Sequence, residues 1–375
     1  VDLAYEDRYR ITLELLEEKV SAKTRMLIIN YPNNPTGRVL TQKEAQVLRQ
    51  FMLNHPDLVL LSGDLFDGGE LYAETGQALV RTLGQTGCPV FIAPGNHDFY
   101  SARSPYARLA WPDNVHLFRR AGLTPVELEG RACTVWGAAF TAPAREDSPL
   151  AGFAAPADGR LHLGVLHGDV EGRGRYGPIG PEEIAASGLT YLALGHIHAR
   201  SGLRRAGETF WAYPGCPEGR GFDELGDKGC LWITVRDDGG VEEEFVPLAR
   251  RRYRVLEADV SGPDPAAALA AALPDDGAED IVRIRLTGES GVERLDLAPL
   301  EAVAAARFYR AELRDETAVP RDLWDRAGED TLTGLFLRRM QERLAAAAED
   351  GARADLERAV RFGLAALEHR EEPMA

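Results

Sequence analysis

The chain has 375 residues, of which 45% are apolar, and its formal net charge is −16. This length suits a catalytic domain with appendages, and the acidic balance argues against binding nucleic acid over the whole surface. No apolar run is long enough to span a bilayer and no secretory leader is visible, so we expect no membrane association. The four cysteines lie far apart without a Cys-x-x-Cys pair, which predicts reduced thiols and a cytoplasmic location.

Short apolar runs that end in a glycine or a polar turn predict a series of buried strands. A segment with helical spacing, residues 70–87, separates the first two runs and ends at glycine. Parallel crossovers early in the chain and antiparallel strands later predict a mixed α/β domain with two packed sheets. The predicted strands are 58–64, 89–95, 132–139, 161–169, 190–198, 208–215 and 229–236.

The character of the sequence changes near Arg250. Residues 251–262 and 279–288 predict two strands on either side of an Ala-rich helix, Pro265–Leu273, which together would form a small α+β appendage. From residue 320 to the end the sequence is helical and rich in Ala, Glu and Arg. These last helices are either an amphipathic cap on the appendage or a surface that docks a partner.

Four short motifs stand where predicted strands end, at the edge where α/β sheets place their active sites. Each contains Asp, Asn or His close to a glycine, which lets the backbone turn sharply beside a metal. Carboxylate, amide and imidazole ligands suit Mn²⁺, Fe²⁺ or Zn²⁺, so four such motifs in order predict a metal site. They are Gly63-Asp64-Leu65-Phe66-Asp67, Gly95-Asn96-His97-Asp98, Leu166-His167-Gly168-Asp169 and Gly195-His196-Ile197-His198.

The order GDLFD, GNHD, LHGD and GHIH resembles the calcineurin-like metallophosphoesterase superfamily. The wording VLLSGDLFDG, PVFIAPGNHD and LALGHIH is most similar to its SbcD-type DNA-repair exonuclease branch, as are IVRIRLTG and GEDTLTGLF nearer the C-terminus. The resemblance implies a four-layer α/β/β/α sandwich with two mixed sheets at 51–250. A small α+β capping domain at 251–319 and C-terminal helices at 320–375 would follow.

The resemblance also implies two divalent metal ions, for which we expect Mn²⁺. Asp64 would bridge the two ions, and His198 would contribute to the first site. Asn96, His167 and His196 would complete the second site. Metal-bound hydroxide would then attack a phosphodiester in line with the leaving oxygen.

By the same resemblance, His97 is the acid that protonates the leaving oxygen, and Asp98 orients its imidazole. Asp67 is expected to support a ligand without binding metal itself. The remaining histidines lie outside the motifs, and we interpret them as structural or surface residues: His55, His116, His162 and His369.

One element of the family pattern is absent. The resemblance implies an opening strand that ends in Asp-x-His, but the chain contains no Asp-x-His, and residues 26–41 stand in its place. Residues 1–45 instead resemble a fragment of a class I pyridoxal-phosphate aminotransferase, with Asn34 matching the asparagine that contacts the cofactor. The cofactor lysine of that family has no counterpart in the fragment, so we expect no pyridoxal phosphate and no aminotransferase activity.

Residues 1–50 are therefore predicted to replace the first strand and helix of the core. MLIIN suits a strand and TQKEAQVLRQFML suits a helix, so we expect packing to survive. Asn30, Asn33 and Asn34 offer only neutral amides, so the first metal would keep just Asp64 and His198. Three explanations stay open: a chimeric or mis-assembled gene product, favoured by the opening at Val1; a fusion that kept only a binding role; or a weak single-metal phosphoesterase.

The leading hypothesis is a Mn²⁺-dependent phosphodiesterase that acts on DNA ends in repair, with activity impaired by the lost ligands. The branch implies DNA, an SMC-like coiled-coil ATPase and a second copy of the chain as partners, with the helices around Leu335–Leu344 as the ATPase dock. One alternative is a non-catalytic subunit that binds DNA or the ATPase. Another is a small-molecule phosphoesterase, against which the long C-terminal appendage argues.

Overall fold

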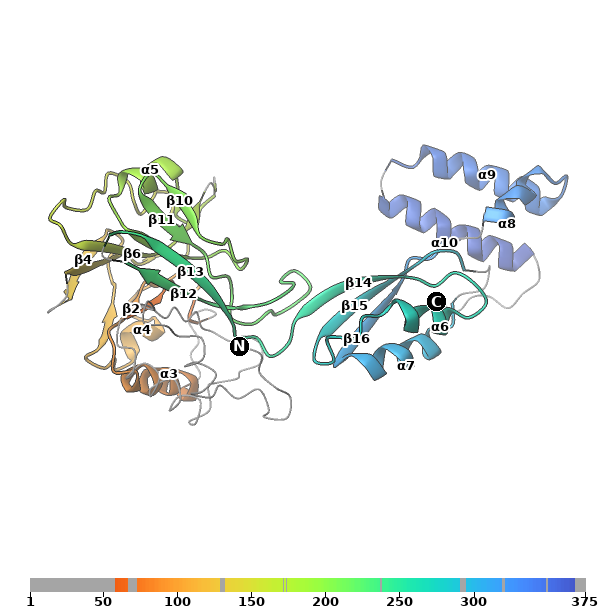
Figure 1. Ribbon diagram of the computed structural model, residues 1–375. Coiled ribbons are helices and arrows are strands. Elements are labelled where there is room, and N and C mark those ends of the chain that lie inside the picture. The colour runs from red at the N-terminus through yellow and green to blue at the C-terminus, as the bar shows by residue number, and fades with distance from the viewer. Residues whose placement is uncertain are drawn as a thin grey trace. The chain divides into compact units, whose positions relative to one another are not determined.

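The computed structural model describes residues 58–66, 73–128, 132–170, 172, 174–236, 238–290, 295–318, 321–348 and 350–367. The chain divides into two compact units, residues 1–250 and residues 251–375, both drawn in Figure 1. The predictions for residues 1–50, and for His55, Asp67 and His369, fall outside the described residues.

A parallel sheet opens the described part of the first unit. It contains β1 (Val59–Leu61), β2 (Val90–Ile92) and β3 (Val115–Leu117), in that order. Parallel neighbours need a crossover, and α3 (Ala73–Gln85) provides it between β1 and β2. The short helix α4 (Pro105–Arg108) lies between β2 and β3 in the chain. These elements confirm the first two predicted strands and the helix between them.

The second sheet is mixed, as predicted. Its strands follow the order β10-β11-β9-β6-β5-β4; the four central strands are parallel, and an antiparallel strand lies at each edge. The bounds are β4 (Thr124–Leu128), β5 (Cys133–Gly137), β6 (Leu161–His167), β9 (Tyr191–Gly195), β10 (Arg204–Ala206) and β11 (Thr209–Ala212).

Shorter elements complete the first unit. After β6 the chain forms a small parallel pair, and the helix α5 follows it. An antiparallel hairpin closes the unit. The elements are β7 (Asp169–Val170), β8 (Pro178–Ile179), α5 (Pro181–Ala186), β12 (Gly229–Val235) and β13 (Val241–Pro247).

Side-chain alternation along the strands places the hairpin in the first layer. Leu231 and Ile233 of β12 join the buried cluster between the sheets, together with Phe91. Trp232, which points the other way, packs in the cluster that contains Ile92 and Leu83 of α3. Because β12 contributes side chains to the same two clusters as β1 and β2, it belongs to their layer.

Helices cover the outer faces of the two layers. Leu83 of α3 packs against the outer face of the first sheet, and Ile184 of α5 packs with Leu192 and Leu194 on the outer face of the second. The sheets bury a common core between them that includes Leu60 and Val165. The predicted four-layer α/β/β/α sandwich is therefore confirmed, and Figure 1 shows its layers.

The second unit begins with strands and helices in alternation. Its three strands are parallel, in the order β14-β15-β16, so each connection needs a crossover helix. The α+β arrangement predicted here is corrected to βαβαβ, because the prediction omitted the fourth and fifth elements. The bounds are β14 (Tyr253–Asp259), α6 (Pro265–Ala272), β15 (Ile281–Thr287), α7 (Leu297–Arg307) and β16 (Arg310–Asp315).

β16 was not predicted because only one face of this sheet is apolar. Val282, Ile284 and Leu286 pack beneath α6 and α7, which cover one face. On the opposite face the side chains are charged, and Arg283 donates to Glu312 of β16 at 3.0 Å. The sequence of β16 (RAELRD) therefore lacks the apolar run by which a strand is recognised.

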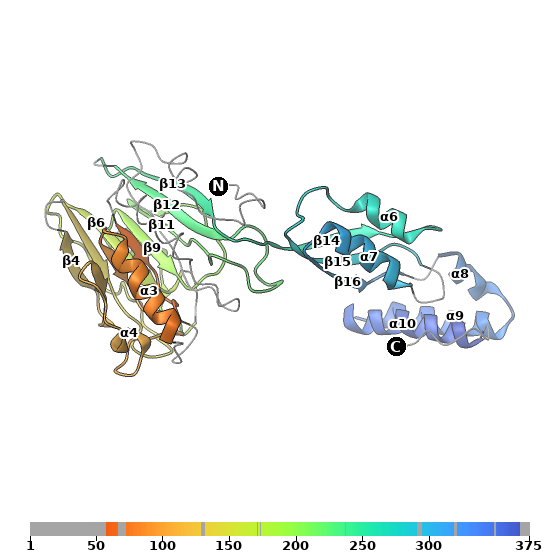
Figure 2. The same ribbon diagram turned by 90° about the horizontal axis from the view of Figure 1, so that it is seen from below.

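The described chain ends in helices: α8 (Arg321–Asp325), a 3₁₀ turn (Arg326–Gly328), and the helical pair α9 (Leu332–Ala346) and α10 (Asp350–Leu367). Figure 1 and Figure 2 together place α9 and α10 side by side, because the helices run alongside each other in the first view and overlap in the second. Leu337 of α9 is fully buried against Leu364 of α10 in a small core. Arg361 of α10 donates to Thr317 Oγ1 at 2.8 Å, which ties the pair to the chain that follows β16.

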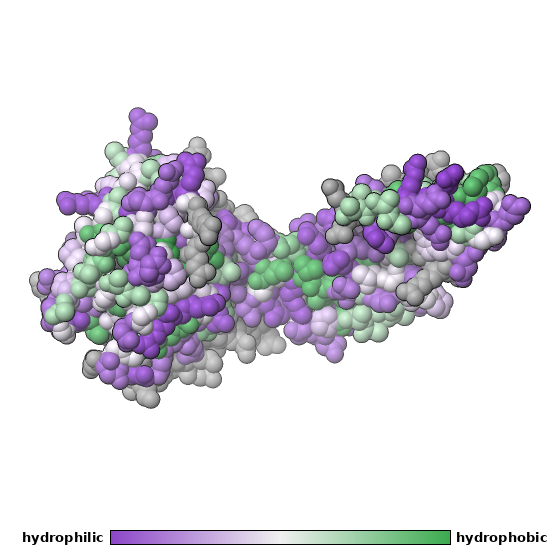
Figure 3. All heavy atoms as spheres, turned by 90° about the horizontal axis from the view of Figure 1, so that it is seen from above, coloured by the Kyte–Doolittle hydropathy of each residue, from purple (hydrophilic) through white to green (hydrophobic). Residues whose placement is uncertain are grey.

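Hydrophilic residues, purple in Figure 3, cover most of the visible face of each unit, in keeping with 27% charged residues. Among the helices of the described ranges, none has the length and apolarity that crossing a bilayer requires.

Candidate metal centre

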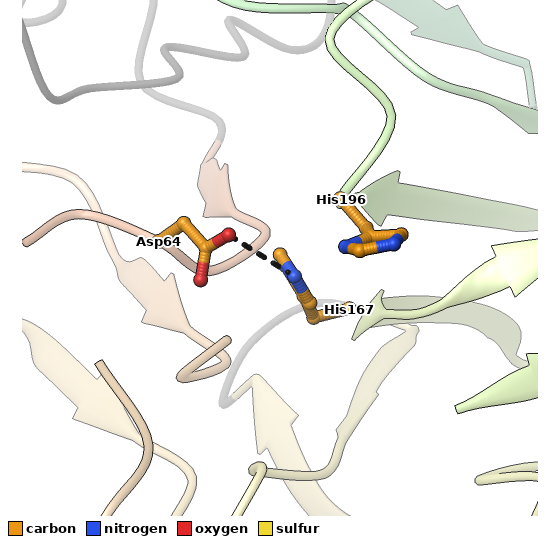
Figure 4. Close-up of side chains that lie close together, drawn as sticks. All are labelled: Asp64, His167 and His196. Carbon is orange, nitrogen blue, oxygen red and sulfur yellow. Dashed lines mark ion pairs between the residues drawn. The ribbon is translucent and has the colours of Figure 1, made fainter. Parts of the chain in front are cut away.

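Four of the predicted site residues meet in space, each at the end of a strand or just beyond it. His167 Nε2 lies 3.3 Å from Asp64 Oδ2 and 2.9 Å from Asn96 Oδ1, and His196 Nδ1 lies 3.2 Å from that same amide oxygen. Figure 4 shows Asp64, His167 and His196 pointing toward one another. Three of these residues also form a group whose ligand atoms lie within 4.8 Å of one another: Asp64, His167 and His196.

The protonation of His167 gives this cluster its chemical meaning. Its Nδ1 lies 2.8 Å from the backbone oxygen of Ser62, which can only accept, so Nδ1 carries a proton. In a neutral ring Nε2 is then a bare lone pair, and it faces two oxygens, from Asp64 and Asn96. Lone pairs repel at this distance, so the arrangement needs either a second proton on His167 or a cation among the ligands.

The backbone at two of these residues is unusual. Asp64 has φ 52° and His196 has φ 104°, and among the described residues no other non-glycine residue has a positive φ. Such conformations cost about 1–3 kcal/mol each and persist where the surrounding structure holds them, commonly at functional sites. Gly95 allows the close approach, because a Cβ there would lie 2.2 Å from Asp64 Oδ1.

Asp98 holds the loops that carry these ligands. One of its oxygens accepts from the backbone N–H of Gly95 at 2.7 Å and of Asp64 at 3.2 Å. The other accepts from the N–H of Phe66 at 3.1 Å and from the hydroxyl of Tyr106 at 2.6 Å. Asp98 is 2% exposed, and its contacts join the loop after β1 to the loop after β2. Its expected action on the His97 ring stays a prediction.

Charges and burial shift the pKa values across the cluster. Burial alone would raise the pKa of Asp64, but the charge and hydrogen bond of His167 outweigh it and lower this pKa to about 2. Burial lowers the pKa of His167, yet Asp64 reverses the direction and raises it. Burial, followed by the charge of His167, lowers the pKa of His196 to about 4. Without a cation, the proton of the cluster therefore rests on His167.

His97 occupies a different setting from the ligands. His97 is exposed, and its backbone N–H donates to Asp64 Oδ1 at 3.0 Å. The side chain lines a pocket that also contains Asp64, His196 and His198. An accessible imidazole beside a metal-ligand cluster can exchange protons with a bound substrate.

His198 joins another group. Its Nδ1 lies 2.5 Å from Glu224 Oε1, and Cys216 Sγ lies 3.8 Å from Glu224 Oε2. These three form a second set of ligand atoms within 4.8 Å of one another. The motifs did not indicate Cys216 or Glu224, because both lie in the loop that follows β11, where the sequence has no metal-ligand spacing.

Two histidines outside the motifs lie in structural settings. His162 is 4% exposed; Trp136 Nε1 donates to its Nδ1 at 3.1 Å, so its Nε2 donates to Asp158 at 3.0 Å. His116 stacks on Phe91 with a 4.9 Å separation of ring centroids. Neither lines the pocket that contains His97.

Comparisons with known proteins agree with this geometry. Residues 41–200 match the model of the family described as calcineurin-like phosphoesterase. Over 202 residues the chain is 34% identical to the uncharacterized metallophosphoesterase YhaO of Bacillus subtilis, covering 51% of this chain and 48% of that one. Over 234 residues it is 28% identical to the DNA double-strand break repair protein Mre11 of Aeropyrum pernix, covering 57% and 56%.

The chain thus spans about half the length of these curated relatives. A separate similarity is short. Over 62 residues the chain is 45% identical to aromatic-amino-acid aminotransferase 2 of Thermococcus litoralis, which covers 16% of each chain.

Proposed function

We propose that this chain, which contains a calcineurin-like metallophosphoesterase domain, hydrolyses phosphodiester bonds at DNA ends with the help of divalent cations. The observation that supports this most is the convergence of Asp64, Asn96, His167 and His196 on one point. The four atoms that meet there are two oxygens and two imidazole nitrogens, a set of donors that a cation stabilises.

The donor set fits a cation such as Mn²⁺, since it combines one carboxylate, one amide oxygen and two imidazoles. Asp64, Asn96, His167 and His196 would hold it. When bound, the cation supplies positive charge to phosphate oxygens and lowers the pKa of a coordinated water. Ser62 fixes the ring of His167 through Nδ1, so Nε2 stays available as the ligand atom.

His97 supplies the proton in this proposal. The leaving oxygen of a cleaved diester needs a proton, and an exposed imidazole that lines the same pocket as Asp64 can donate it. The backbone bond from His97 to Asp64 keeps the acid at a fixed place relative to the ligands. Asp98 supports both through its bonds to the backbone of Asp64 and Gly95.

The first test is the hydrolysis of bis(p-nitrophenyl) phosphate by the full chain with Mn²⁺. We expect metal-dependent release of nitrophenol. Because nitrophenolate leaves without a proton, the role of His97 is tested on linear duplex DNA, whose leaving oxygen is an alkoxide, and there His97→Ala should reduce the rate by about 10²-fold or more. His116→Gln is the matched control, because this histidine lies on β3 outside the pocket. Equal rates of DNA hydrolysis for the wild type and His97→Ala would exclude His97 as the acid.

The choice of DNA ends as substrate rests on the similarity to a protein named for DNA double-strand break repair. A linear duplex and a covalently closed circle of the same sequence test this choice, because only the linear duplex has ends. We expect degradation of the linear DNA only. Hydrolysis of the model diester with neither DNA degraded would instead indicate a small-molecule phosphoesterase.

A non-catalytic role is the second candidate, and the position of His198 favours it. His198 groups with Cys216 and Glu224, separately from Asp64, and the chain has no Asp-x-His to complete the first metal site. A chain without hydrolysis under Mn²⁺, Mg²⁺, Co²⁺ or Zn²⁺ that still binds DNA would establish this role.

We also propose that the C-terminal helices dock an SMC-like coiled-coil ATPase. Leu332 and Leu335 of α9 are 68% and 48% exposed, and Phe362 of α10 is 46% exposed. Such side chains favour contact with an apolar helix face. Deletion of the residues after 320, or Leu332→Glu with Leu335→Glu, should abolish co-purification with the ATPase. Gln341→Glu on the same helix should not, and retained binding by the double variant would refute the dock.

We propose that the similarity to aminotransferases lies in residues 1–45. We propose that they carry no pyridoxal-phosphate chemistry, since the lysine that binds this cofactor has no counterpart among them. Addition of pyridoxal phosphate should therefore yield no transamination of aspartate or aromatic amino acids. Transamination by the purified chain would refute this.

A further inference from the structure

A second group of metal-binding side chains lies beside the proposed hydrolase cluster. It consists of His198, Cys216 and Glu224, whose ligand atoms lie within 4.8 Å of one another. The Glu224 side chain is only 5% exposed, and its oxygens contact Arg220 and His198. His198 and Cys216 line the pocket that also contains Asp64.

The group can accommodate a small tetrahedral cation once His198 turns away from Glu224. With bonds of about 2.0–2.2 Å to nitrogen and oxygen and about 2.3 Å to sulfur, neighbouring ligand atoms lie roughly 3.3–3.6 Å apart. Cys216 Sγ and Glu224 Oε2 are 3.8 Å apart, close to that spacing. His198 Nδ1 and Glu224 Oε1 are 2.5 Å apart and must separate by about 1 Å. The His198 side chain is 42% exposed, so it has room to turn.

The Arg220 guanidinium already places a positive charge beside Glu224 and His198. The guanidinium of Arg220 donates to Glu224 Oε1 at 3.2 Å, and its Nη2 lies 3.2 Å from His198 Nδ1. The Arg220 backbone N–H donates to Glu224 Oε2 at 2.7 Å, which holds the loop whether or not the side chain moves. The Arg220 side chain is 40% exposed and can swing into solvent.

We propose that His198, Cys216 and Glu224 bind a zinc-type cation, with the Arg220 guanidinium standing in its place in the metal-free chain. A thiolate, an imidazole and a carboxylate are the ligands that Zn²⁺ takes, whereas the neighbouring cluster offers no sulfur. On binding, a sulfur–metal bond forms and the thiol proton of Cys216 passes to solvent. Three protein ligands leave a fourth position open toward the pocket. The site goes beyond the proposed hydrolysis and does not require it.

Co²⁺ tests the site, because it takes zinc ligands and shows a thiolate charge-transfer absorption in the near ultraviolet. Full-length chain stripped of metal with a chelator and kept reduced should develop this absorption on titration with Co²⁺, and Zn²⁺ should remove it. Cys216→Ser should lose the absorption completely. Cys133→Ser is the matched control, since Cys133 is buried in β5, and it should keep the absorption.

Two further variants separate this site from its neighbour and from a mere hydrogen-bond network. Asp64→Asn, which disables the proposed hydrolase, should leave the charge-transfer absorption unchanged. Arg220→Gln should tighten Co²⁺ binding, about tenfold if its charge competes with the cation. Absence of the absorption in the wild type at saturating Co²⁺, or weaker Co²⁺ binding in Arg220→Gln, would overturn the proposal, whatever the hydrolysis assays show.

Discussion

His167 Nε2 lies 3.3 Å from Asp64 Oδ2, while Nδ1 of the same ring is held by the backbone oxygen of Ser62. Burial opposes a charged His167, but the carboxylate of Asp64 prevails and raises the His167 pKa above its usual value near 6.5. The ring must lose this proton before Nε2 can bind a cation. Metal binding and proton release are therefore coupled at this site.

We accordingly expect Mn²⁺ affinity to rise with pH through the region above about 6.5, where His167 in the metal-free chain is still protonated. The sign follows from both shifts, the lowered pKa of Asp64 and the raised pKa of His167. The Asp64–His167 pair stabilises the metal-free fold fully between about pH 4 and 6.5. This contribution is lost as the pH rises through the folded pKa of His167 or falls through that of Asp64, about 2. Calorimetric titration in two buffers of different ionisation enthalpy counts the released protons. An affinity that does not change between about pH 6 and 8 would contradict the coupling.

Replacement of Asp98 tests the support of the ligand loops. In Asp98→Asn an NH₂ group replaces one of the two carboxylate oxygens, and it cannot accept a hydrogen bond. It then faces either the N–H of Phe66 and the hydroxyl of Tyr106, or the N–H groups of Gly95 and Asp64. A buried donor without an acceptor costs about 1–3 kcal/mol, so the free energy of unfolding should fall by that amount. Denaturant titration of the metal-free chain measures it.

Tyr106→Phe is the control for Asp98→Asn, because it removes one of the four donors and leaves the carboxylate in place. Its loss of stability should be smaller, about 0.5–1.5 kcal/mol. If both variants lose the same stability, the backbone bonds of Asp98 contribute little and the support of the loops comes from elsewhere.

The sequence predicted the parts of the site that depend on strand ends. Asp64, Asn96, His167 and His196 each lie at or just after the end of an apolar strand. Strands of packed sheets end at a common edge, so their meeting could be expected. Glu224 could not be predicted, since it reaches His198 from a loop without regular spacing. Its contacts depend on tertiary structure alone.

The fold shows the same division. Runs of apolar residues marked β1, β2, β5, β6, β9, β11 and β12, which are largely buried. The partly exposed strands β3, β4 and β10 were not predicted. β16 was missed since one of its faces is charged and paired with β15, as in the bond between Glu312 and Arg283. The crossover helix α7 was missed with it, which turned a βαβαβ unit into an α+β prediction.

Close packing at Gly195 provides a further test of the site. A Cβ at this position would lie 1.8 Å from the backbone oxygen of Ser62, the atom that orients His167. Gly195→Ala should therefore displace Ser62, destabilise the fold by about 1–3 kcal/mol and weaken Mn²⁺ binding. Gly122→Ala is the control, because beyond its chain neighbours no atom lies within 4 Å of its Cβ position. Unchanged Mn²⁺ binding in Gly195→Ala would show that Ser62 does not position the ring.

The separate cores of the two units predict that damage to one leaves the other intact. Leu364 and Leu337 are fully buried between α9 and α10, whereas Leu60 and Val165 belong to a core of the first unit. Leu364→Ala should destabilise the helical pair by about 2–5 kcal/mol, because it removes buried methyl groups and leaves a cavity. Hydrolysis of bis(p-nitrophenyl) phosphate should persist while ATPase co-purification is lost. Because the proposed dock lies on α9 and α10 and the proposed acid lies in the first unit, loss of both properties together would show that the units depend on each other to fold.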